Sequence, residues 1–158
     1  MNTQQWLALF ESAFREMDKN LEQVLLLSSC REHWIQAQIS LHAWSVHGVD
    51  IWTDLPIGNR RKADLYSLNE AEEPVMVAEV KCLGDLYQAK CLDGAWSVRA
   101  DIERLRSFPC PARLFVLVIA KDGPETAIGR RLREDDWDIT EPSTDVELGH
   151  ARIRMWSL

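Results

Sequence analysis

The sequence lacks the features of a membrane protein, an exported protein or a zinc site. No stretch approaches the roughly 18 consecutive apolar residues that a membrane-spanning helix needs. The N-terminal residues contain no basic start, apolar run and small-residue cleavage site in the order of a signal peptide, so we expect a cytoplasmic protein with no membrane partner. The four cysteines form no C-x2-C pair, which predicts free thiols rather than zinc ligands. They are Cys30, Cys82, Cys91 and Cys110.

Basic residues are in the minority. The chain has 18 Lys and Arg against 25 Asp and Glu, a net charge of −7. Binding to nucleic acid by bulk charge depends on neutralising phosphates, so such a chain is poorly suited to it. The charge is uneven, however, with 6 basic and 12 acidic residues up to Glu79 and 12 and 13 after it. The later part of the chain can therefore present a basic face.

No linker, repeat or low-complexity tract divides the 158 residues, which predicts a single domain over 1–158. Residues 1–30 are expected to form an N-terminal helical extension, because apolar residues from Thr3 to about Leu27 recur at spacings of three and four. A break is expected at residues 18–20. Ser28 or Ser29 is expected to cap a second helix at residues 31–45.

The remaining pattern predicts an α/β fold with a mixed central sheet flanked by helices. Short loops join the first three predicted strands, which favours antiparallel pairing, and a helix before the fourth favours parallel pairing there. A turn at residues 54–56 is expected to end the first strand. The predicted strands are residues 49–53, 62–68, 75–83, 112–120 and 151–156, with further helices at 97–107 and 125–134.

Two charged residues interrupt the most apolar strand. Residues 75–83 read as a central strand covered on both faces, yet they include Glu79 and Lys81. Alternation puts both on one side of the strand, together with Val75 and Val77. Asp64 precedes Glu79 by 15 residues, so a hairpin closed by the loop at 69–74 brings it opposite Glu79. Two carboxylates on adjacent strands suit Mg²⁺, or Mn²⁺, and Lys81 can then stabilise charge on a phosphoryl group. The competing interpretation is a partly exposed Glu–Lys pair at a strand end.

Asp64, a 14-residue spacer and Glu79-Val80-Lys81 together resemble the motif of the PD-(D/E)XK nuclease superfamily. The predicted α-β-β-β-α-β order over about 31–120 resembles its restriction-endonuclease-like core. The resemblance implies that Asp64, Glu79 and the Val80 carbonyl bind metal and that Lys81 is catalytic. It also implies an acidic residue on the first core helix, for which Glu32 fits better than Glu22. Ala63 stands where the motif's name has proline.

Basic residues near the motif are candidates for binding nucleic acid. The run Arg60-Arg61-Lys62 comes just before Asp64, and Arg99 lies on the helix after the motif; Arg forks match phosphate oxygens. A solvated turn is the other interpretation of the run. The histidines are expected to be hydrogen-bonded or solvated.

Two functions are open from the sequence. The first is a metal-dependent phosphodiesterase for which DNA, rather than RNA, is the expected substrate, with a homodimer or protein partner as a further expectation. The second is an inactive module with the same fold that binds a protein or nucleic acid.

Overall fold

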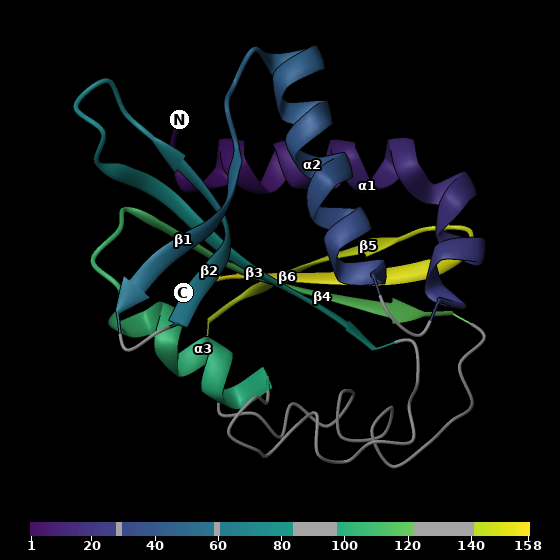
Figure 1. Ribbon diagram of the computed structural model, residues 1–158. Helices are drawn as coiled ribbons and strands as arrows, with labels where there is room; N and C mark the ends of the chain where they lie inside the picture. Colours follow the sequence, from purple (N-terminus) through teal and green to yellow (C-terminus); the bar gives the residue numbers. More distant parts are fainter. Residues whose placement is uncertain (28–29, 59–60, 84–97, 122–140) are drawn as a thin grey trace.

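The computed structural model describes residues 1–27, 30–58, 61–83, 98–121 and 141–158 (Figure 1). Within these ranges the chain forms helices α1 (Thr3–Leu25), α2 (Arg31–His47) and α3 (Val98–Ser107), and strands β1 (Trp52–Gly58), β2 (Arg61–Leu68), β3 (Pro74–Leu83), β4 (Ala112–Ala120), β5 (Ser143–Glu147) and β6 (Ala151–Ser157).

The strands make one mixed sheet in the order β1-β2-β3-β4-β6-β5. The pairs β1/β2 and β2/β3 are antiparallel and β3/β4 is parallel, as predicted. Helices α1 and α2 cover one face of the sheet and α3 covers the other (Figure 1). The predicted α/β architecture with a mixed, helix-flanked sheet is therefore confirmed.

Helix α1 is continuous, so the predicted break at residues 18–20 is wrong. Its buried face continues past that point through Leu21, Val24 and Leu25. Asp18 does not mark a helix end but makes a tertiary contact. Its carboxylate accepts hydrogen bonds from the backbone N–H groups of Gly149 and His150, in the turn between β5 and β6. The helix starts with a reciprocal capping box between Asn2 and Gln5.

Helix α2 begins after Cys30, which adopts a left-handed conformation (φ 62°) and makes no side-chain cap. The cap predicted at Ser28 or Ser29 falls outside the described residues. The helix ends at His47, two residues later than predicted, where Gly48 takes the left-handed conformation common after a helix.

Strand β1 corrects the first predicted strand and its turn. It begins at Trp52 and runs through residues 54–56 as far as Gly58, with Pro56 paired to Lys62. Proline is tolerated because β1 lies at the edge of the sheet, where one side of the strand needs no backbone donor.

Strand β5 was not predicted because its sequence is mostly polar and exposed. Only Val146 of its five residues is buried. Cross-strand ion pairs support it instead, including Arg154 with Asp145 and Arg152 with Glu147. The helix predicted at residues 125–134 lies outside the described residues.

No helix in the described part of the chain is long and apolar enough to span a membrane. Cys30, Cys82 and Cys110 are free thiols, as predicted, and Cys91 lies outside the described residues. Burial raises the pKa of the Cys82 thiol to about 12, so it packs as a small neutral side chain.

Candidate functional site

The site forms where β2 separates from β3. Their pairing ends at Leu65 opposite Ala78, whereas β3 continues to Leu83. Extending the register by one residue places Asp64 opposite Glu79, as predicted. The backbone of β3 beyond this point has no β2 partner on that side, so its N–H groups need other acceptors.

Two carboxylates supply those acceptors. Asp64 Oδ2 accepts a hydrogen bond of 2.9 Å from the Val80 N–H, and Glu32 Oε1 accepts one of 2.9 Å from the Cys82 N–H. Glu32 lies in the first turn of α2, so this contact ties the helix to the end of β3. The N–H and C=O of one strand residue point to the same edge, so the Val80 carbonyl faces the same gap.

The edge strand is also irregular beside the site. Thr53 pairs with Leu65 and Leu55 pairs with Ala63, so Asp54 lies opposite Asp64 between these two pairs. Asp54 has a φ of 66°, a left-handed conformation that Asp adopts more readily than most residues. The strand therefore departs from regular geometry at the position facing Asp64.

Glu79 and Lys81 lie on the face of the sheet that α3 covers. Val77 on the same side belongs to the core beneath α3, whereas Val80 belongs to the core beneath α1 and α2. Val75, expected with Val77, instead packs against the core beneath α1 and α2. Glu79 is only 4% exposed, whereas the side chain of Lys81 is 25% exposed and pairs with Asp101, so only the lysine of the expected partly exposed pair reaches solvent.

Helix α3 contributes Asp101, which the sequence did not identify, and Arg104, for which the sequence suggested a place in a nucleic-acid groove but no contact with Glu79. Arg104 Nη2 donates to Glu79 Oε1 at 2.6 Å and to Asp101 Oδ1 at 2.7 Å. The other oxygen of Asp101 lies 3.2 Å from Lys81 Nζ. One signal was available, because Asp101 falls among the apolar residues Val98, Ile102 and Leu105 on the buried face of α3. An acidic residue in such a position requires a partner.

Burial makes the two facing carboxyls hard to ionise together. It raises the pKa of Glu79 to about 8, and the charge of Asp64 adds to that effect against the opposing influence of Arg104. Burial also raises the pKa of Asp64, although hydrogen bonds from Val80 and with Glu79 oppose the rise. The pair therefore retains a proton near neutral pH.

Lys81 is held as a cation. Burial alone lowers its pKa, but the carboxylates of Asp101, Glu32 and Asp64 outweigh burial and raise the pKa above the ordinary value. A lysine that keeps its proton can stabilise negative charge and donate hydrogen bonds, but it is a poor general base at neutral pH.

The predicted acidic residues are not arranged as a ready-made metal cluster. Among the described residues, no group of three or more His, Cys, Asp or Glu side chains is placed to hold an ion. Asp64 and Glu79 adjoin each other, while Glu32 binds the Cys82 N–H nearby. The metal-binding roles predicted for Glu32, Asp64, Glu79 and Val80 stay predictions.

The predicted phosphate-binding residues are only partly described. Lys62 is exposed and its ammonium lies 3.4 Å from Asp54, so the cation has an acidic neighbour in β1. Arg99 is half-buried in the first turn of α3. Arg60 and the side chain of Arg61 lie outside the described residues. Their predicted contact with nucleic acid stays a prediction.

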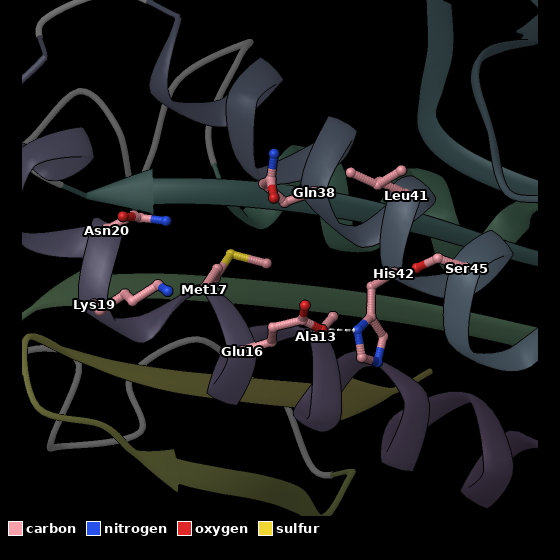
Figure 2. A pocket seen from close by; sticks show the side chains of 9 residues that line it. All are labelled: Ala13, Glu16, Met17, Lys19, Asn20, Gln38, Leu41, His42 and Ser45. Carbon is pink, nitrogen blue, oxygen red and sulfur yellow. Dashed lines mark hydrogen bonds and ion pairs between the residues drawn. The ribbon is translucent and has the colours of Figure 1, made fainter.

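A separate small pocket of about 240 Å³ lies between α1 and α2 (Figure 2). His42 on its wall is hydrogen-bonded through Nδ1 to Glu16 at 2.5 Å and through Nε2 to Ser12 at 3.0 Å. This confirms the expectation of a satisfied histidine. Both ring nitrogens are used in linking α2 to α1, and the pocket is smaller than most ligand sites.

No protein-family model, curated protein or solved structure matches this chain.

Proposed function

We propose that the protein is a magnesium-dependent phosphodiesterase that cleaves DNA, with a restriction-endonuclease-like core and a PD-(D/E)XK site. The single observation that carries the proposal is the pairing of the half-buried Asp64 with the buried Glu79 where β2 leaves β3, beside the cationic Lys81. The order α2, β1 to β3, α3, β4 and the strand directions support the comparison with that core.

The residues present fit a hard divalent cation. A buried and a half-buried carboxyl that retain a proton between them gain from a cation that replaces the proton. Mg²⁺ commonly takes one or two carboxylates together with water and phosphate oxygens. Asp64, Glu79 and the Val80 carbonyl would hold the ion, with Glu32 at the margin. When bound, the ion supplies Lewis-acid activation of water and of a phosphoryl oxygen.

The chain's own residues then have separate tasks. Lys81 presents an ammonium group to the charge that develops on the phosphoryl oxygens. Asp101 holds that ammonium in place and keeps it protonated. Asp64 and Glu32 also fix the backbone of β3, because they accept the hydrogen bonds of Val80 and Cys82.

A cleavage assay with Mg²⁺ or Mn²⁺ and both duplex and single-stranded DNA tests the proposal. Asp64→Ala, Glu79→Ala and Lys81→Ala should each abolish cleavage, while the exposed Glu70→Ala should cleave like the wild type. Circular dichroism should show that the three inactive variants are folded. Wild-type activity in Glu79→Ala would refute the proposal.

A second candidate is a module of the same fold that binds a partner without cleaving. The net charge of −7 favours it, and so does the engagement of Glu79 by Arg104. Calorimetric titration with Mn²⁺ distinguishes the two candidates, because a module without a working site should show no saturable binding that depends on Asp64.

A further inference from the structure

Arg104 occupies an unusual position for a structural arginine. Its side chain is 12% exposed, and it bridges the carboxyls of Glu79 and Asp101, both about 5% exposed. The bridge joins β3 to α3 across the site itself. A cation thus already sits on the carboxyl that the proposed function assigns to the metal.

The hydrogen-bonding capacity of Arg104 is not exhausted by these contacts. Both bonds come from Nη2, while the buried Nε finds no acceptor among the residues that the structure describes. A guanidinium has five N–H donors in a planar fork, and a buried donor without an acceptor is unfavourable. The unused donor points to a further anionic ligand.

A divalent ion on Glu79 conflicts with the present contact. The guanidinium lies 2.6 Å from Glu79 Oε1, so an ion bound by that oxygen meets a positive charge at close range. Asp101 Oδ1, in contrast, can keep its bond to Nη2 at 2.7 Å when Glu79 is withdrawn. Arg104 would then remain beside the site with most of its donors available.

We propose that Arg104 exchanges partners: it holds Glu79 in the metal-free protein, gives Glu79 up when a divalent ion binds, and then binds a phosphate of the substrate while Asp101 keeps it in place. This inference rests on the proposed function. It makes Arg104 a phosphate-binding residue, since the guanidinium fork matches phosphate oxygens, and it makes metal binding the event that frees it.

Calorimetric titration with Mn²⁺ tests the first half of the exchange. Arg104→Met should bind Mn²⁺ about tenfold tighter than the wild type, because a competing charge-assisted bond is lost. Removing the guanidinium also lets Glu79 bind its proton more tightly, and that proton competes with Mn²⁺. The guanidinium charge repels a divalent ion twice as strongly as a proton, however, so Mn²⁺ binding should still become tighter. Arg106→Met is the matched control on the same helix, because Arg106 pairs with Glu141 instead.

Arg104→Gln repeats the test in case the methionine variant does not fold, because an amide still donates one hydrogen bond to Glu79. Tighter Mn²⁺ binding is expected again. Unchanged or weaker Mn²⁺ binding in a folded Arg104 variant would overturn the inference. A role confined to stabilising the fold predicts that weaker binding.

Inorganic phosphate titrated into the Mn²⁺-saturated protein tests the second half. Wild-type affinity for phosphate should exceed that of Arg104→Met by about tenfold, and equal affinities would overturn the exchange. If the wild type binds Mn²⁺ through Asp64 but the Arg104 variants bind no tighter, only the inference fails. If no variant binds Mn²⁺, the proposed function fails with it.

Discussion

Glu79 is subject to opposing influences: burial and Asp64 disfavour its charged form, whereas Arg104 favours it. It stands in a central strand, 4% exposed, with Asp64 on one side and Arg104 on the other. Burial and the charge of Asp64 outweigh the opposing effect of Arg104 and raise the pKa of Glu79 to about 8. A site that holds a proton so far above the ordinary pKa of a carboxyl is one in which a cation has something to replace.

Replacing the Glu79 carboxyl by an amide should change how the stability of the folded protein depends on pH. The pKa of Glu79 is raised on folding from 4.5 to about 8, so its contribution is fully present below pH 4.5 and is lost as pH rises through 8. In metal-free buffer Glu79→Gln should therefore gain stability relative to the wild type between pH 5 and 9, on the order of a few kcal/mol. Urea unfolding at each pH measures this difference.

The exposed Glu70→Gln serves as the control for that series and should parallel the wild type. A constant difference between Glu79→Gln and the wild type across the range would show that Glu79 does not keep its proton in the folded protein.

The left-handed conformation of Asp54 is a second feature at the residue scale. A non-glycine residue in this region costs roughly 1 kcal/mol, and glycine does not pay that cost. Asp54→Gly should therefore be as stable as the wild type or more stable by up to about 1 kcal/mol. Thr53→Gly, next to it in regular strand geometry, should lose about 1 kcal/mol in thermal unfolding. Equal losses in both variants would contradict the conformation at Asp54.

At the scale of elements, α3 is attached to the sheet by charge as well as by its apolar face. Asp101 is the centre of that attachment, because it contacts both Lys81 and Arg104 while 3% exposed. Removing one member of a buried ionic network leaves its partners uncompensated, which is far more costly than losing an exposed pair.

Asp101→Asn should therefore destabilise the protein by about 3–5 kcal/mol in chemical denaturation. Asp145→Asn is the comparison, since it breaks the more exposed pair with Arg154 between β5 and β6 and should cost about 1 kcal/mol or less. Similar losses in the two variants would mean that Asp101 is not the link between α3 and β3.

The elements also show which parts of the fold can be predicted from sequence. Residues 112–120 were located correctly because an apolar, β-branched run leaves few alternatives. Strand β5 was missed because it is held by partners on β6 rather than by its own apolar pattern, and β1 was displaced because an edge strand accepts proline. The same distinction, between a local pattern and contacts made only in the folded protein, applies to the site. Asp64, Glu79 and Lys81 stand out within strands, whereas Asp101 and Arg104 acquire their role only when α3 packs on β3.

At the scale of the whole molecule, the site is built from elements that are far apart in the sequence and lie in different layers of the fold. Helices α2 and α3 lie on opposite faces of the sheet (Figure 1). Glu32 of α2 contacts the Cys82 N–H and Asp101 of α3 contacts Lys81, both in the part of β3 that β2 has left. The net charge of −7 opposes approach of a polyanion. On the proposed function, a divalent ion bound by Asp64 and Glu79 would act together with Lys81 and Arg104, which both contact Asp101, in binding a phosphate.

The central claim is that Asp64 and Glu79 form a divalent-cation site, and calorimetric titration with Mn²⁺ at pH 8.5 and 6.5 tests it most directly. We predict saturable binding that is markedly weaker at pH 6.5, because the ion must displace the shared proton, and that is lost in Asp64→Asn and Glu79→Gln but kept in Glu70→Gln. Absence of binding, or binding that Asp64→Asn leaves unchanged, would contradict the claim.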